Sequence, residues 1–296
     1  MKAWRDSSIS GGTLRLILLT ALAILAFAAN SVLARLAFAT AGAEPLSYTG
    51  IRLSAGAITL AILLAARSSF KIAGSWAGAA SLFGYAIFFS IAYILLSAGT
   101  GALILFASVQ IGILGWGIYK GDRPSPFEWL GLLIAFGGLV YLVSPGLVAP
   151  STIGAALMLV AGLCWAAYTL IGRGSSSPLS DTSGNFIRTL PVAIALILVA
   201  ACTRTITPTA AFYAIASGAI ASGIGYAIWY AVLPSLTRTR AAIVQLTVPA
   251  IAAAGGIAFI GEPMTFRLGA ASVAILGGVC LALLVADRRR SKANPS

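Results

Sequence analysis

The stretch GEPMTFRLGAASVAILGG at residues 261–278 has a counterpart in GDRPSPFEWLGLLIAFGG at residues 121–138. Both stretches begin with a glycine and an acid, and both reach a glycine pair sixteen residues later, at Gly137-Gly138 and Gly277-Gly278. Residue types agree upstream as well, where Gly115 corresponds to Gly255. Two halves that share the same order and spacing of residue types indicate a duplicated fold. In a very apolar chain, such a duplication favours a transporter, because many transporters are pairs of repeats around a central site.

The composition predicts a chain embedded almost wholly in a membrane. Of its residues, 59% are hydrophobic and 9% charged, and no Asp, Glu, Lys or Arg occurs in 72–119, 129–172 or 205–237. Since a helix needs about 20 apolar residues to cross a bilayer, each run holds at least one crossing. The net charge of +12 comes from single Lys and Arg residues in short connections and from a C-terminal cluster, a pattern of cytoplasmic loops and not of a nucleic-acid surface.

Apolar stretches separated by Gly, Pro, Ser and charged residues predict ten helices and an all-α membrane protein. The expected spans are 14–39, 45–66, 76–97, 101–119, 126–144, 152–171, 184–202, 208–233, 239–260 and 266–286. The first span is long and lacks a small-residue cleavage site, so it is expected to be a spanning helix and not a removed signal.

The positions of Lys and Arg predict the orientation. With a cytoplasmic N-terminus, the inside segments carry fourteen of the nineteen basic residues and the outside loops carry two, Arg204 and Arg267. Both termini are then cytoplasmic, and the acidic motifs at 121–122 and 261–262 face opposite sides. We therefore expect one integral membrane domain made of two inverted five-helix repeats, residues 1–150 (helices 1–5) and 151–296 (helices 6–10).

Several motifs resemble those of the drug/metabolite transporter superfamily, specifically its EamA-type ten-helix exporters. Asn30 and Arg35 match a signature in the first helix, and Pro249 with Gly261-Glu262-Pro263 matches a stretch near the end of the second half. The first half departs from the pattern, since Val109-Gln110 stands where a proline is usual and Asp122 replaces Glu.

The resemblance implies a central cavity lined by helices 1, 3, 4, 6, 8 and 9, with helices 5 and 10 outside it and packing the halves together. The overall pattern and Trp165 in helix 6 are most similar to the amino-acid exporters, including the aromatic amino-acid exporters. This implies a protein of the bacterial inner membrane, with amino acids and the lipid bilayer as its partners. A monomer is expected.

Aromatic residues at helical spacing are candidates for the cavity walls. Trp165, Tyr168 and Thr169 share one face of helix 6. Tyr85, Phe89 and Tyr93 form a stripe on helix 3, and Tyr226, Trp229 and Tyr230 form another on helix 8. Packing between helices would explain these stripes equally well. Among the amides in apolar helices, we expect Asn30 and Gln245 to face the cavity and Gln110 to lie elsewhere.

The charged residues are predicted to be mainly structural. Arg52 and Arg188 occupy corresponding places in helices 2 and 7, where an arginine could bind a substrate carboxylate but more simply satisfies loop carbonyls or reaches the interface. The same mainly structural role is expected of Arg35, near the end of helix 1. The acids that begin helices, Asp122, Glu262, Glu44 and Glu128, are expected to complement the positive N-terminus of the helix that each begins. Bending points for gating are predicted at Gly99, Pro234 and Pro249.

No helix has an Asp, Glu or His in its middle, and the chain has no histidine at all. Proton-coupled carriers usually keep such a residue near the membrane centre, so we expect no obligatory proton coupling. The three cysteines lie in apolar runs without metal-ligand spacing, and no nucleophile or phosphate-binding motif is present, so neither an enzyme nor a metal or cofactor is expected.

The prediction is an exporter of aromatic and other neutral amino acids and related metabolites that works by alternating access. Three alternatives are considered. Export of cationic drugs or sugars would favour an acid in the cavity, a channel would need a continuous pore, and a non-transporting scaffold would have no use for the repeat.

Overall fold

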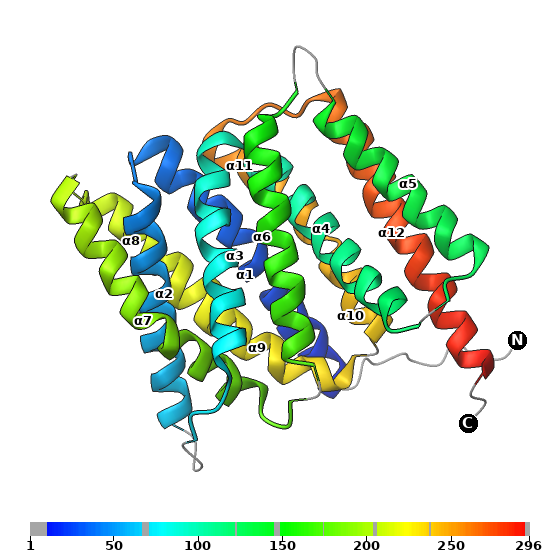
Figure 1. The fold of residues 1–296 in the computed structure, drawn as a ribbon, viewed down its shortest axis with the longest axis horizontal. Coiled ribbons are helices and arrows are strands. Elements are labelled where there is room, and N and C mark those ends of the chain that lie inside the picture. The colour runs from blue at the N-terminus through cyan, green and yellow to red at the C-terminus, as the bar shows by residue number, and fades with distance from the viewer. Residues whose placement is uncertain are drawn as a thin grey trace, which may run out of the picture.

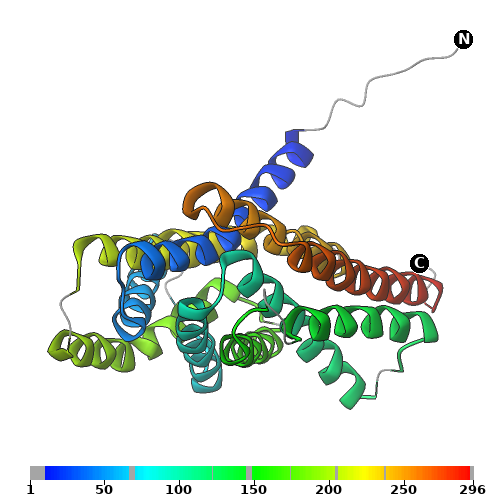
Figure 2. The ribbon, with the colours of Figure 1, turned by 90° about the horizontal axis from the view of Figure 1, so that it is seen from above.

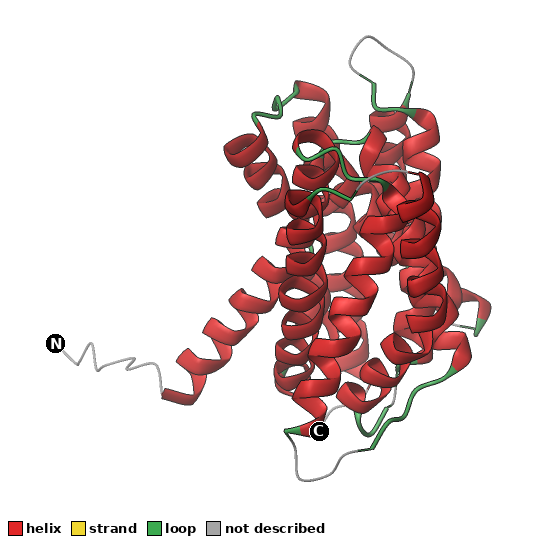
Figure 3. Cartoon of the chain, turned by 90° about the vertical axis from the view of Figure 1, so that its left-hand side faces the viewer, coloured by secondary structure: helices red, strands yellow, loops and turns green. Residues whose placement is uncertain are grey.

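A computed structural model of the chain describes residues 11–66, 71–121, 123–144, 149–173, 175–203, 206–236 and 238–293. These residues form helices joined by short loops (Figure 3). Ten segments of the described chain are long and apolar enough to cross a membrane. The elements are, in chain order, α1 (Gly11–Thr40), α2 (Pro45–Ala65), α3 (Trp76–Leu95), α4 (Ala98–Tyr119), α5 (Pro126–Val143), α6 (Thr152–Ile171), α7 (Pro178–Thr203), α8 (Pro208–Ala216), the π-helix η1 (Ser217–Ile224), α9 (Gly225–Val232), the 3-10 helix η2 (Leu233–Ser235), α10 (Arg238–Gln245), α11 (Val248–Ile260) and α12 (Phe266–Ala293).

The predicted count of ten spanning segments is confirmed, and two of the segments are irregular. The eighth consists of α8, η1, α9 and η2, and the ninth consists of α10 and α11. The break in the ninth lies at Leu246-Thr247, just before Pro249. Because proline has no N–H, the bond that residue 249 would donate to the carbonyl of Gln245 is missing, and the helix restarts with Pro249 in its first turn.

Four boundaries differ from the predicted spans by three or more residues, one of them the start of α1, which lies at Gly11 and not at 14. Helix α7 begins at Pro178, six residues before the expected 184, because a proline suits the first helical turn; the polar residues that follow, Ser180, Thr182 and Ser183, are buried within the bundle. Helix α4 begins at Ala98 and not at 101, with Ser97 as its N-cap. Helix α12 continues to Ala293, beyond the expected 286.

Glu44 and Glu128 lie at the starts of α2 and α5, as predicted for acids that complement helix N-termini. The Glu44 carboxylate accepts hydrogen bonds from the backbone N–H groups of Leu46 (2.9 Å) and Ser47 (2.8 Å). Glu128 lies in the first turn of α5, where its carboxylate accepts a hydrogen bond from Ser125, the N-cap. Glu44 thus satisfies two N–H groups at the start of its helix, and Glu128 places a negative charge in a first turn, where the helix carries partial positive charge.

Helices α5 and α12 pack against each other at one end of the bundle, while α7 and α8 lie at the other end (Figures 1 and 2). The repeated glycine pairs explain this contact. A Cβ on Gly278 would meet the Gly131 carbonyl oxygen at 2.5 Å, and a Cβ on Gly138 would meet the Ala274 Cβ at 2.8 Å. The first glycine of each pair, Gly137 or Gly277, has no such neighbour within 4 Å. The second glycine of each pair therefore lets the two helices approach closely.

The other main contacts join α2 to α7, α3 to α6, α4 to both α6 and α11, and α1 to α11 and α9. Many large apolar side chains remain exposed on the outer faces of the bundle, among them Leu18, Ile62, Leu133 and Val273. Such a surface would be unfavourable in water and is suited to lipid. The protein is a multi-pass membrane protein.

Candidate functional site

A cavity of about 820 Å³ lies among the helices, a volume typical of sites for small molecules. Its walls come from α1, α3, α4, α6, α7, η1, α9, η2 and α10, and Leu283 and Ala286 of α12 also line it, so the last predicted helix does not lie wholly outside the cavity. At one end its lining includes the last residues of α4 and α6 and the first residues of α5 and α7. We call this end of the bundle the open pole, marked by Glu128 and Asp181. The opposite end, at the start of α4 and the end of α11, is called the closed pole.

Aromatic rings make up the central wall of the cavity. The ring of Trp165 on α6 lies 4.7 Å from that of Tyr85 on α3, 5.2 Å from Tyr168 and 5.3 Å from Tyr226 on α9. Phe27 on α1 packs edge-on against Trp229, with centroids 5.6 Å apart. Aromatic rings from four helices thus lie close together in the wall of the cavity. They provide a surface for an apolar or aromatic group.

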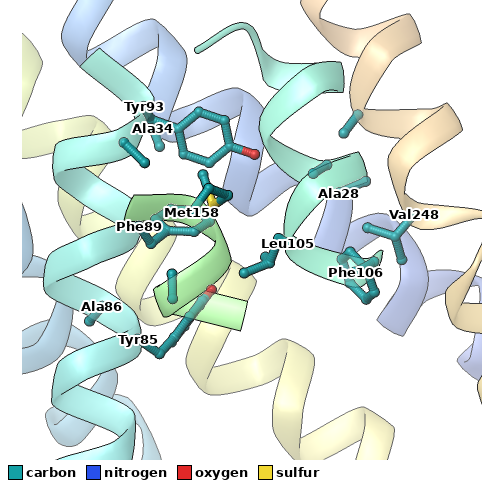
Figure 4. Packing of buried hydrophobic residues seen from close by; sticks show 14 of the residues in the cluster. Ala28, Ala34, Tyr85, Ala86, Phe89, Tyr93, Leu105, Phe106, Met158 and Val248 are labelled. Carbon is teal, nitrogen blue, oxygen red and sulfur yellow. The ribbon is translucent and has the colours of Figure 1, made fainter. Parts of the chain in front are cut away.

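The side chains of α3 explain the shape of this wall. Tyr85, Phe89 and Tyr93 project from one face of α3 toward α4, where Leu105 faces them (Figure 4). Tyr85 and Phe89 line the cavity. Tyr93 instead lies over Gly101 in the first turn of α4, and its hydroxyl donates to the carbonyl of Ala98 at 3.3 Å. Two residues of the aromatic stripe therefore line the cavity, and the third, Tyr93, packs against α4.

A buried polar corner adjoins the aromatic wall. The Tyr85 hydroxyl oxygen accepts hydrogen bonds from Asn30 Nδ2 and from Arg52 Nη2, both at 3.0 Å. The Oδ1 of Asn30 accepts a hydrogen bond from the Ser217 hydroxyl at 2.5 Å. The guanidinium carbon of Arg52 lies 5.1 Å from the Tyr85 ring centroid and 4.7 Å from that of Phe89. The corner thus links α1, α2, α3 and η1 through one connected set of polar groups.

The π-helix η1 brings Ser217 into this corner. A Cβ on Gly218 would meet the backbone oxygen of Arg52 at 2.1 Å, so the start of η1 lies directly on the backbone of α2. Ser217 itself is fully buried. Short π-helical segments frequently occur at functional sites. Nothing in the apolar periodicity of residues 208–233 indicated this segment.

The closed pole is held by a group of residues from α1, α3, α4 and the loop between α11 and α12. Arg35 Nε, near the end of α1, is 2.9 Å from Glu262 Oε1, and Arg35 Nη1 donates to the Tyr93 carbonyl at 2.8 Å. Glu262 Oε2 accepts from the backbone N–H of Ala98 at 2.8 Å. Gly261, with a φ of 74°, turns the chain so that Glu262 can reach these partners. The cavity lining does not extend to this group.

Comparisons with known proteins agree with this architecture. The model of a family described as the EamA-like transporter family matches residues 152–284. An uncharacterised protein of Pseudomonas aeruginosa is 47% identical over 271 residues, which cover 91% of this chain and 94% of that protein. The chain belongs to the EamA-like transporter family. It is therefore a membrane transporter of the drug/metabolite transporter superfamily.

More distant relatives of this EamA-like transporter span almost the same length. An uncharacterised transporter of Bacillus subtilis is 22% identical over 280 residues, covering 90% of this chain and 91% of that one. A protein of known crystal structure superposes with a TM-score of 0.62 at 19% identity, covering 92% of this chain and 99% of that chain. This similarity supports the helical fold.

The structure of the transporter places all eight predicted cavity residues along the cavity. They are Asn30, Tyr85, Phe89, Trp165, Tyr168, Tyr226, Trp229 and Gln245. Gln110 also lines it, so the expectation that Gln110 lies elsewhere is wrong. An amide in an apolar helix correctly indicated a side chain that avoids lipid. Whether that side chain faces the cavity or a neighbouring helix depends on how α4 packs against α6.

Other expectations for charged residues need correction. Glu262 does complement a helix N-terminus, but that helix is α4, reached across the bundle, and not α12. Arg188 satisfies loop and helix carbonyls as predicted, donating to Ala73 O at 2.6 Å and Gly184 O at 2.9 Å. Arg52 is predicted to satisfy loop carbonyls or to reach the membrane interface. It is instead 2% exposed and donates a hydrogen bond to Tyr85 beside the cavity. Asp122 lies outside the described residues.

The three predicted bending points occupy different places. Gly99 is not at the end of α3, which ends at Leu95, but in the first turn of α4. A Cβ there would meet the Ala253 Cβ at 2.6 Å, so Gly99 serves close packing against α11. Pro234 lies in η2 and lines the cavity, and Pro249 follows the break between α10 and α11.

Asp181 is a lining residue that sequence reasoning missed. Its carboxylate accepts from the backbone N–H of Gly74 at 2.8 Å and also contacts the Ser175 hydroxyl. Its position three residues after Pro178 could have indicated a first-turn acid had the start of α7 been placed correctly. Among the described residues, no group of three His, Cys, Asp or Glu side chains is placed to hold a metal ion.

Proposed function

We propose that this transporter exports amino acids, aromatic and other neutral ones, and related small metabolites from the cytoplasm across the inner membrane by alternating access. The observation that carries the proposal is the cavity itself, in which the rings of Tyr85, Trp165 and Tyr226 meet beside a buried polar corner. An amino acid has the same combination of an apolar side chain and a compact polar group. Aromatic walls with a few placed polar groups are typical of small-molecule sites.

The two poles of the bundle support a carrier over a channel. The cavity reaches the open pole, whereas the Arg35–Glu262 group holds the closed pole, to which the cavity lining does not extend. Lys120, Arg123 and Arg173 follow the ends of α4 and α6, at the open pole. Basic loops are typical of the cytoplasmic side, so this arrangement fits a state open to the cytoplasm. The paired contacts of α5 with α12 through Gly138 and Gly278 support an inverted repeat, which gives such carriers their two alternate states.

The positions of the acids support facilitated export without proton coupling. Of the described carboxylates, Glu128 and Asp181 line the cavity, and both belong to first helical turns at the open pole. A carrier of this kind would move substrate down its concentration gradient. Reconstituted vesicles should therefore not accumulate phenylalanine in response to a pH gradient, and accumulation would contradict this part of the proposal.

Efflux from cells loaded with a phenylalanine-containing dipeptide tests the function directly. Cells that produce the protein should release phenylalanine faster than cells that lack it. Trp165→Ala should lower this efflux severalfold, because the central ring contacts are lost. Trp116→Ala is the matched control, because Trp116 is exposed on the outer face of α4 and does not line the cavity. No enhanced efflux of any amino acid would refute the assignment.

A further inference from the structure

Arg52 carries a buried positive charge that has no negative partner among the residues the structure describes. Its side chain is 2% exposed, and it lies within α2, a membrane-spanning segment. None of the described carboxylates pairs with it, and Nη1 has no hydrogen-bond partner among the described residues. Its guanidinium donates to the Tyr85 hydroxyl and lies against the faces of Tyr85 and Phe89, the two α3 residues that line the cavity. A buried charge without a partner is costly, so a ligand that supplies the missing charge would be stabilised there.

The hydrogen bonds in the same corner determine what Tyr85 can offer to a ligand. Its hydroxyl oxygen already accepts from Arg52 Nη2 and Asn30 Nδ2. A phenol oxygen has two lone pairs, so both are used and the hydroxyl is left as a donor. No described protein group accepts this proton, and Tyr85 borders the cavity.

Asn30 is restricted in the same way. Its Oδ1 accepts from Ser217, and one of the two Nδ2 hydrogens is donated to Tyr85. The second Nδ2 hydrogen remains, and Asn30 also lines the cavity. The corner therefore presents two donors, a hydroxyl and an amide N–H, with an uncompensated guanidinium directly behind them. Donors backed by a cation favour an oxyanion, because hydrogen bonds to a charged acceptor are about twice as strong as neutral ones.

We infer that the corner formed by Asn30, Tyr85 and Arg52 is a carboxylate subsite, and that the transported molecule must carry a carboxylate but need not carry an ammonium group. This inference rests on the proposed function and narrows its substrate class to carboxylates with an apolar or aromatic group. The apolar group lies against Trp165 and Tyr226, whose rings adjoin Tyr85. Tyr85 and Asn30 contact the carboxylate, while Arg52 acts through Tyr85 as a positioning residue. Cations without a carboxylate are disfavoured by the same buried charge.

Three probes of equal ring structure and different charge test the subsite. They are L-phenylalanine, which is zwitterionic, N-acetyl-L-phenylalanine, which is anionic, and L-phenylalaninamide, which is cationic. Binding to the purified full-length protein is followed by tryptophan fluorescence, to which the phenylalanine ring contributes little. The first two probes should bind, and the amide should bind at least about tenfold more weakly, since it cannot accept strong hydrogen bonds from the two donors.

Variants separate recognition from folding. Tyr85→Phe should weaken binding of N-acetylphenylalanine about tenfold and leave that of the amide nearly unchanged. Tyr93→Phe, on the same helix but outside the cavity lining, should leave the ratio of the two dissociation constants unchanged. Arg52→Gln should reduce this ratio and Arg52→Lys should restore part of it. If the Arg52 variants do not fold, the Tyr85→Phe comparison decides the question by itself.

The outcomes distinguish the inference from the function on which it rests. If phenylalanine and its amide bind equally well, or if Tyr85→Phe does not weaken binding of the N-acetyl probe, the subsite is refuted and export of amino acids still stands. If N-acetylphenylalanine binds and phenylalanine does not, the subsite stands and the amino-acid assignment fails. If none of the three probes binds, both are refuted.

Discussion

Replacing Glu262 by glutamine should shift the transporter away from the conformation described here. The Glu262 carboxylate joins the N-terminus of α4 to the end of α1, with the backbone N–H of Ala98 at 2.8 Å and Arg35 Nε at 2.9 Å. Both side chains of the ion pair are largely buried, with exposed fractions of 17% for Arg35 and 10% for Glu262, so solvent screens the pair only weakly. Since the closed pole must separate when the cavity opens on that side, these contacts stabilise one of the two states.

The size of the effect follows from the contacts that are lost. Glutamine retains an acceptor oxygen but no charge, which weakens a hydrogen bond to a charged group worth roughly 1.5–3 kcal/mol. About 1.4 kcal/mol corresponds to a factor of ten. The population of the alternate conformation, in which the closed pole has separated, should therefore rise about ten- to hundredfold. Glu262→Ala should have a larger effect, since it leaves the Arg35 charge unpaired.

The assay measures the accessibility of one cysteine from the two sides of the membrane. Leu105 lines the cavity, so Leu105→Cys is introduced where Cys164, Cys202 and Cys280 are replaced by alanine. A membrane-impermeant thiol reagent is applied to spheroplasts and to inside-out vesicles. Glu262→Gln should speed labelling from the outer side and slow it from the cytoplasmic side.

Glu44→Gln is the matched control for this experiment. Glu44 lies at the same pole, but its carboxylate caps only the start of its own helix, α2. This variant should lower the thermal stability through the lost cap and leave the labelling ratio unchanged. Unchanged outer labelling in Glu262→Gln, or an equal increase in Glu44→Gln, would refute the reasoning about the closed pole.

Two further predictions concern stability. Gly278→Ala should lower the melting temperature in detergent, because the new Cβ would meet the Gly131 carbonyl at 2.5 Å and force α5 and α12 apart at a cost of roughly 1–3 kcal/mol. Gly277→Ala, with no neighbour within 4 Å, should leave the melting temperature unchanged or raise it, and equal losses in both variants would contradict the packing argument. Arg188→Met should cost about 1–3 kcal/mol, because it leaves the Ala73 carbonyl without its donor, yet it should not alter the dissociation constant for phenylalanine. A change in that constant would mean that Arg188 belongs to the binding site.

The sequence predicts the number and approximate positions of the membrane-spanning segments because each must be apolar over the thickness of the bilayer. It also predicts which residue types line the cavity, since amides and aromatic stripes in apolar helices are recognisable without a structure. The break before Pro249 could be predicted for the same local reason, the missing N–H of proline.

Contacts between distant segments could not be predicted in this way. Glu262 bonds to Ala98, which is 164 residues away in the chain, and no local pattern distinguishes that partner from the nearby start of α12. Arg52 and Arg188 look equivalent in the sequence. The first faces the rings of Tyr85 and Phe89 beside the cavity and the second faces backbone carbonyls, a difference made by the packing of α2 against α3 and η1.

The most direct test of the central claim is counterflow in reconstituted vesicles. Vesicles that contain the protein are loaded with unlabelled phenylalanine and diluted into a trace of labelled phenylalanine. A carrier with one cavity exposed alternately to each side should accumulate the label transiently above its equilibrium level, because internal substrate speeds the return of the cavity to the outer face. Uptake of label that is the same with and without internal phenylalanine would contradict alternating access in this protein.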